Sequence, residues 1–107
     1  MRLPIDTSAI SFLAGGEAEP MTEHDSGKPR LDRDGKPLFV LRVVALAEGE
    51  AEILTVRFAG TPAKGIGQGV PIRCGGLSAT PWSMGDRSGI TYRAEHVEPA
   101  SPPRPAS

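Results

Sequence analysis

The sequence predicts a small all-β domain, and three observations lead to this prediction. Thirteen glycines and eleven prolines among 107 residues leave little room for long helices. Residues 37–60 and 70–97 alternate apolar and polar side chains with the period of two that is typical of half-buried strands. The length and the 38% hydrophobic content are those of one ordinary globular domain with a modest core.

The first expected strand runs from Ser8 to Ala14, because it holds three large apolar residues and is followed by two glycines. Glu17 to Met21 is expected to be a short extended segment, since Pro20 excludes a helix there. Thr22 to Lys36 is polar and contains two turn motifs, so we expect a mobile loop rather than a domain boundary.

The clearest element is an antiparallel hairpin of Phe39 to Ala47 and Glu52 to Ala59 around Gly49. A register that pairs residue 41 with 58, 43 with 56 and 45 with 54 would bury all the large apolar side chains together. In that register Arg42 lies opposite Arg57 on the other face. Facing like charges cost a few tenths to about 1 kcal/mol, unless an anion lies between them. Either both arginines extend into water or pair with nearby carboxylates, or they form an anion-binding face.

Residues 61–69 contain three glycines but no nucleotide-loop pattern, so we expect a flexible link that could include a short helix. Beyond it, Val70 to Cys74 is expected to be a strand closed by two glycines. An irregular link, Leu77 to Trp82, and a turn then lead to a second strand, Gly89 to Ala94.

Basic and aromatic residues are interleaved in this last region, as on surfaces that hold a phosphate backbone and stack bases. The candidates there are Arg73, Trp82, Arg87, Tyr92 and Arg93. A structural role remains open for both aromatic residues. Trp82 could close one end of a barrel, and Tyr92 could pack in the core with Ile90 and Ala94, which share its face.

The net charge of −1 conceals an uneven distribution. Residues 1–27 carry one arginine and five carboxylates, whereas residues 28–93 carry ten basic and six acidic side chains. The body is therefore mildly basic and the N-terminal segment acidic, a segment that could screen a basic groove or simply be solvated surface. Residues 99–107, with four prolines and small residues, are expected to be a disordered tail.

Catalysis, cofactors and metal ions are not expected. The two histidines have no cysteine partner at zinc spacing, and carboxylate pairs such as Glu48 with Glu50 lie in exposed turns. Cys74 could form a dyad with His96 in three dimensions, although a lone cysteine in a strand is more often a small buried hydrophobe. The single cysteine favours a reducing cytoplasm, and we expect no secretory signal, membrane span or membrane partner.

The order of elements is that of a five-stranded barrel of the OB-fold type. Residues 70–98 read Val-x-Ile-x-Cys-Gly-Gly-Leu, then Pro-Trp, then Arg-x-Gly-Ile-x-Tyr-Arg-Ala, which resembles the closing strands of OB-fold single-stranded DNA-binding proteins. Residues 1–98 are also similar to small proteins of unassigned role from actinobacterial plasmids and integrative elements.

These resemblances imply an OB-fold-like β-barrel over residues 1–98 and a non-catalytic protein that binds single-stranded DNA or RNA, in plasmid or mobile-element replication or transfer. The expected nucleic-acid-binding residues are Arg42, Arg57, Arg73, Trp82, Arg87, Tyr92 and Arg93. The alternative is a protein-interaction or regulatory subunit that binds a protein partner in the same groove. An exposed edge strand would also permit homo-oligomers.

Overall fold

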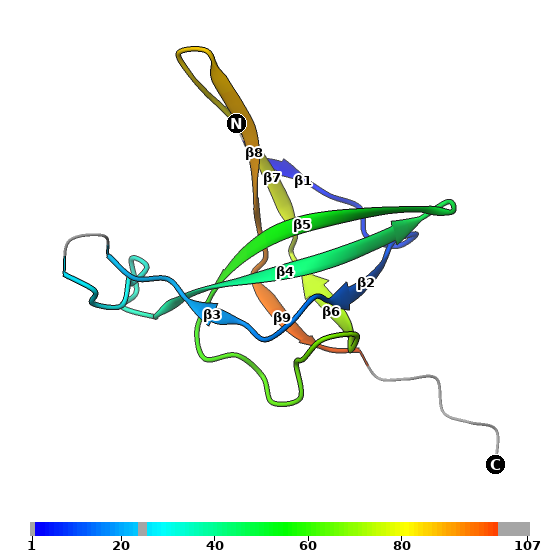
Figure 1. Cartoon of the computed structure of the whole chain (residues 1–107), viewed down its shortest axis with the longest axis horizontal. Coiled ribbons are helices and arrows are strands. Elements are labelled where there is room, and N and C mark those ends of the chain that lie inside the picture. Colours follow the sequence, from blue (N-terminus) through cyan, green and yellow to red (C-terminus); the bar gives the residue numbers. More distant parts are fainter. Residues whose placement is uncertain (1, 24–25, 101–107) are drawn as a thin grey trace.

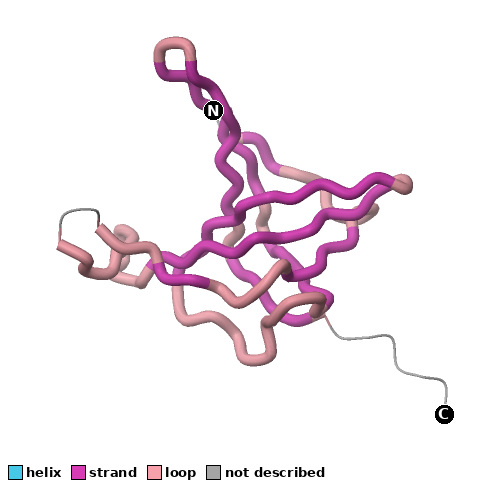
Figure 2. Tube along the Cα trace, in the orientation of Figure 1, coloured by secondary structure: helices cyan, strands magenta, loops and turns pink. Residues whose placement is uncertain are grey.

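The computed structural model describes residues 2–23 and 26–100, and the all-β prediction is confirmed for them (Figures 1 and 2). No helix occurs in these two ranges, so none could span a membrane. The strands are β1 Leu3–Pro4, β2 Ser11–Ala14, β3 Glu19–Pro20, β4 Leu38–Ala47, β5 Glu50–Ala59, β6 Pro71–Gly75, β7 Ser78–Met84, β8 Arg87–Arg93 and β9 His96–Pro99.

One strongly curled, open sheet contains all of these strands (Figure 1). Its order is β1-β7-β8-β5-β4-β2-β6-β9, with β3 paired to β4 beside β2. The expectation of five strands is wrong for the described residues, because short strands near both ends of the chain and inside the expected link add to the sheet. Pro99 ends β9 and so belongs to the sheet, whereas the expected disorder of residues 101–107 falls outside the described part of the chain.

The expected irregular link, Leu77 to Trp82, is mostly strand β7, which pairs along its length with β8. Pro81 concealed this strand in the sequence. Proline is tolerated there because β7 pairs with β1 only at Ser78 and Ala79, so its outer edge is open from Thr80 onward. Gly85 has a φ of 64°, as the two-residue turn between β7 and β8 requires.

The hairpin of β4 and β5 is confirmed, but its register differs by two residues from the expected one. Glu48 and Gly49, with φ of 53° and 79°, form a two-residue turn with both residues left-handed, as in type I′. Leu41 therefore pairs with Val56, and Arg42 faces Thr55 rather than Arg57. The predicted direct opposition of Arg42 and Arg57 is wrong.

The concave face of the curled sheet holds the core. Leu41, Val43 and Val56 are its largest fully buried side chains. Phe39 and Phe58, paired across the hairpin, stack with ring centroids 5.9 Å apart. Because side chains alternate along a strand, residues 40, 42 and 44 of β4 and 53, 55 and 57 of β5 point to the outer, convex face.

Two connecting segments differ from simple loops. Among residues 22–23 and 26–37, Thr22 pairs with Pro29 and Leu31 with Pro37 as isolated bridges, so the described part of this segment has its own turn structure. The predicted mobility of this segment stays a prediction. Residues 61–69 form turns without the short helix that the sequence allowed.

Residues 80–91 form a two-stranded ribbon that leaves the sheet, and we call it the arm. On one side β1 reaches only to Ala79, and on the other β5 pairs with β8 only at Tyr92 and Arg93. Within the part of the chain that the structure describes, the arm therefore has no lateral strand partner, and Figure 1 shows it extending away from the curled body.

Candidate nucleic-acid interface

Arg57 and Arg93 lie side by side on the outer face. The parallel strands β5 and β8 pair Arg57 with Arg93, and both side chains are exposed. Paired strands are about 4.8 Å apart, so the two guanidinium groups project from adjacent points of the surface. Among the described residues the one ion pair within 4.0 Å joins His96 Nε2 to Glu98 Oε1, at 3.9 Å, so neither arginine has a carboxylate at that range. An anion between them would relieve their repulsion.

The arm extends this basic pair into a longer surface. Alternation along β8 places Arg87, Gly89 and Thr91 on the same face as Arg93. The cross-strand register adds Thr80 and Trp82 of β7 to that face. We call this set, Arg57, Arg93, Thr91, Thr80, Trp82 and Arg87, the outer stripe. The six residue steps from Arg87 to Arg93 span about 20 Å at the usual rise of a strand.

Trp82 lies directly over Gly89. A Cβ atom at position 89 would be 2.8 Å from Cζ2 of the indole, so the absence of a side chain there lets the ring approach the backbone of β8. The Trp82 side chain remains 41% exposed. An aromatic ring supported on one side and open on the other is suited to stacking against a base.

A polar pocket of about 620 Å³ adjoins the stripe at Arg93. Its other basic side chains are Arg2, Arg33 and Lys36, and its acidic ones are Asp32, Asp34 and Glu95. Oδ1 of Asp32 accepts hydrogen bonds from the backbone N–H groups of Asp34 and Lys36, at 2.9 and 2.8 Å. The sequence analysis did not predict a role for these basic residues. The excess of basic over acidic side chains in residues 28–93 was the one feature that could have indicated it.

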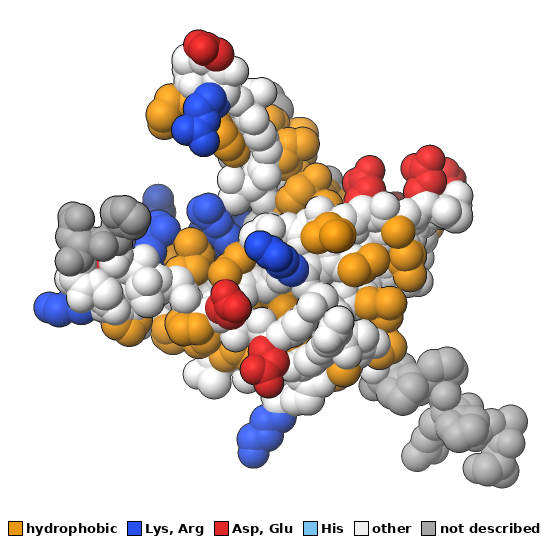
Figure 3. All heavy atoms as spheres, viewed as in Figure 1, with side chains coloured by type: hydrophobic (Ala, Val, Ile, Leu, Met, Phe, Trp, Pro, Cys, Tyr) orange, Lys and Arg blue, Asp and Glu red, His pale blue; other side chains and the backbone are white. Residues whose placement is uncertain are grey.

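Arg42 is next to the stripe but in a mixed environment. It lies one strand further than Arg57, diagonal to it on the outer face. A groove shared with Thr55 also contains Glu17 and Glu19. Figure 3 shows basic and acidic side chains close together on this side of the β4–β5 hairpin. Its acidic neighbours make Arg42 a weaker phosphate contact than Arg57, which lines neither this groove nor the pocket at Arg93.

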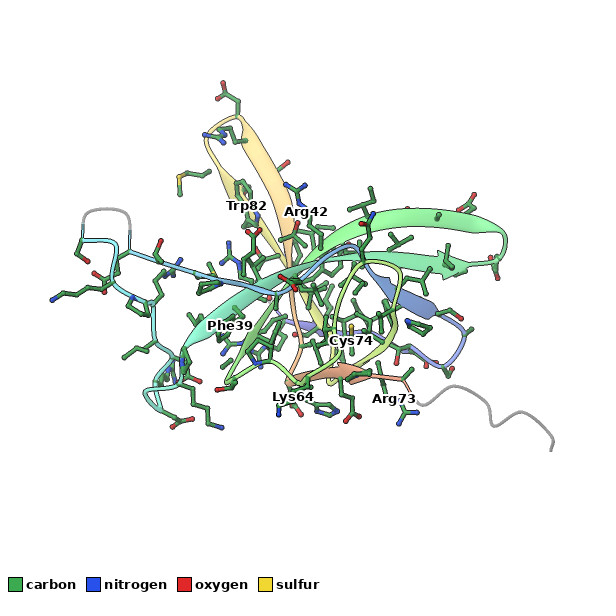
Figure 4. All side chains as sticks on the ribbon, turned by 60° about the horizontal axis from the view of Figure 1, so that its bottom comes forward. Phe39, Arg42, Lys64, Arg73, Cys74 and Trp82 are labelled. Atoms are coloured by element: carbon green, nitrogen blue, oxygen red, sulfur yellow. The ribbon has the colours of Figure 1, made fainter. Side chains whose placement is uncertain are left out.

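Two predicted site residues lie apart from the stripe. Arg73 of β6 pairs with Glu98 of β9, and Figure 4 shows it far from Arg42 and Trp82. Tyr92 is on the concave face, where it pairs with Val56 and packs against the core. The structure thus joins four of the seven predicted residues, Arg57, Trp82, Arg87 and Arg93, places Arg42 beside them and separates Arg73 and Tyr92.

Cys74 and His96 do not form a dyad. Cys74 pairs with Val97 on the concave face, where burial raises the pKa of its thiol to about 11. His96 pairs with Gly75 on the other face, and its ring covers that glycine. Within residues 2–23 and 26–100, no three His, Cys, Asp or Glu side chains gather as metal ligands would.

No protein-family model, curated protein or solved structure matches this chain. Function is therefore inferred from the chemistry of the outer stripe.

Proposed function

We propose that this protein binds single-stranded nucleic acid along the outer stripe and catalyses no reaction. The observation that supports this proposal most directly is the placement of Arg57 beside Arg93, with no carboxylate of the described residues within 4.0 Å of either. A phosphate between two guanidinium groups removes the repulsion and accepts charge-assisted hydrogen bonds from both.

The remainder of the stripe favours a polymer over an isolated anion. Trp82 offers a ring on which one base can stack, a contact worth about 1–3 kcal/mol. Arg87 provides a second basic group about 20 Å from Arg93, beyond the aromatic ring. Because stacking requires an unpaired base, a single strand fits this surface better than a duplex.

The resemblance of residues 70–98 to the closing strands of OB-fold single-stranded DNA-binding proteins is part of this proposal. The curled sheet with a basic outer face is compatible with such a fold. The resemblance also implies a role in replication or transfer of plasmids or mobile elements, and the single cysteine favours a place in the cytoplasm.

A titration of the full chain against labelled single-stranded DNA, duplex DNA and RNA, at about 50 and 200 mM salt, tests the proposal. We expect micromolar or tighter binding to single strands that weakens with salt. For single strands the log–log slope is about −0.7 per phosphate contact. Replacing both Arg57 and Arg93 with Gln removes the one phosphate contact that they share, so it should make the slope less negative by about 0.7.

Arg73→Gln is the matched control, because it removes one exposed arginine on a strand far from the stripe. It should leave both the affinity and the slope nearly unchanged. Equal effects of the stripe and control variants, or no salt-sensitive binding of single strands at micromolar protein, would reject the proposal in favour of a protein-interaction role.

A further inference from the structure

The arm exposes large apolar side chains on both of its faces. Trp82, Met84 and Ile90 are 41%, 77% and 53% exposed, and alternation places Ile90 on the face opposite the other two. A two-stranded ribbon without further strands is only marginally stable in water. Contact with another surface would therefore both cover these side chains and stabilise the arm.

A cleft of suitable chemistry lies between the base of the arm and the tip of the β4–β5 hairpin. It has a volume of about 300 Å³, at the lower end of ligand pockets, so it is suited to one or two side chains. Its apolar walls include Ile10, Phe12, Leu54, Leu77 and Tyr92.

The rim of this cleft is acidic. Glu48, Glu50 and Glu52 line it, and among the described residues no lysine or arginine does. Glu50 and Glu52 point to the concave side because they pair with Ala47 and Ala45, whose side chains share the face of the core. The cleft thus favours an occupant that combines an apolar group with a positive charge.

The end of the arm has this combination. Met84 and Arg87 are directly opposite each other beside the turn, so their side chains project from the same face. The arm cannot fill the cleft of its own molecule, because its base adjoins Tyr92 at the cleft while its tip extends away from the body (Figure 1).

We propose that the arm of one molecule enters the cleft of a second copy of this chain. Met84 enters the apolar space, and Arg87 pairs with Glu50 and Glu52 at the rim. Such a contact joins two different surfaces, so two molecules close as a symmetric dimer if each inserts its arm into the other, and otherwise continue as a chain. Because Arg87 is also in the outer stripe, nucleic acid and the second copy compete for the arm.

Sedimentation velocity of the full chain without nucleic acid, over a range of concentrations, tests this inference. We expect reversible self-association that Arg87→Glu in the arm, or Glu50→Lys with Glu52→Lys in the cleft, weakens at least tenfold. All three positions are exposed, so both variants should retain the wild-type circular-dichroism spectrum.

Mixing the two variants provides the decisive measurement. The Arg87→Glu chain keeps a wild-type cleft and the Glu50→Lys, Glu52→Lys chain keeps a wild-type arm, so the mixture should form a complex of one of each. Arg73→Glu, on a distant strand, should associate like the wild type.

A wild-type chain that stays monomeric up to about 1 mM, or a mixture that shows no complex, would overturn the inference. The Arg57→Gln, Arg93→Gln variant should still self-associate, because neither residue lines the cleft or lies in the arm. Failure of the nucleic-acid proposal and failure of this one are thereby distinguished.

Discussion

Arg57 and Arg93 are neighbours in the parallel ladder between β5 and β8, although 36 positions separate them in the chain. The two strands that bring them together also position Val56 in the core and Tyr92 against it, both on the opposite face. The sheet thus maintains a like-charge pair at its surface as a consequence of how its core packs. A bound anion would lower the free energy of this arrangement.

Replacing Arg57 with Glu should stabilise the free protein and weaken its binding of single-stranded DNA. The new carboxylate would lie beside Arg93, so the repulsion becomes an attraction worth about 0.2–1 kcal/mol. Urea unfolding gives the stability and a DNA titration gives the affinity. A loss of stability together with unchanged affinity would contradict a functional role for this pair.

Arg73→Glu is the control, with the opposite expected effect on stability. Arg73 faces Glu98 across β6 and β9, so this substitution places two carboxylates opposite each other. It should lower stability by a similar few tenths to about 1 kcal/mol while leaving DNA binding nearly unchanged. Opposite signs of the two stability changes would confirm the registers of both strand pairs.

Trp82 is the only tryptophan in the sequence, so its fluorescence reports on the arm alone. Stacking against a base should quench this emission as single-stranded DNA is added. Trp82→Ala should reduce affinity by about 1–3 kcal/mol. Tyr92→Phe, on the concave face, is the matched aromatic control and should bind as the wild type does. Unquenched emission at saturating DNA would exclude stacking on Trp82.

The turn between β4 and β5 contains a strained residue, and a substitution can relieve this strain. Glu48 has a φ of 53°, a left-handed conformation that Asn adopts more readily than Glu. Glu48→Asn should therefore raise the free energy of unfolding by up to about 1 kcal/mol, measured by urea denaturation at low protein concentration. Gly49→Ala, at a φ of 79°, should do the reverse. A loss of stability in Glu48→Asn would be evidence against the two-residue turn.

This turn also explains one limit of prediction from the sequence. The strong alternation of residues 38–47 and 50–59 was enough to predict the hairpin, because a period of two survives any even shift of register. The register itself depends on the turn, and Glu-Gly is not among the usual pairs of a type I′ turn. A shift of two residues keeps every side chain on its predicted face. It places Arg57 diagonal to Arg42, however, and not directly opposite it.

Prediction of the candidate site from the sequence was limited by long-range strand pairing. Arg57, Arg87, Arg93 and Trp82 were selected from residue type, but their meeting depends on the parallel pairing of β5 with β8, for which no local pattern exists. Tyr92 is next to Arg93 in the sequence, but adjacent residues of a strand point to opposite faces. Tyr92 therefore lies on the concave face and not in the stripe with Arg93. Strand β7 was missed because Pro81 is a strand breaker everywhere except at an open edge.

Cys74 is buried on the concave face beside Val97. Burial raises the pKa of its thiol from 9.0 to about 11. Between these two pH values the unfolded chain releases the thiol proton while the native protein keeps it. Raising the pH from 9 to 11 therefore favours unfolding, and the stability contributed by the neutral thiol, complete below pH 9, is lost across this interval.

Urea unfolding at pH 7, 9 and 10.5, for the wild type and for Cys74→Ala, measures this effect, since other titrating groups are common to both chains. The alanine variant should be less stable at pH 7, because it leaves a small cavity in the core. Its stability should fall less steeply above pH 9, so the difference between the two chains narrows. In the native wild type a thiol reagent should react only as fast as the protein opens. Parallel stability curves with rapid thiol modification would show that Cys74 is accessible to solvent.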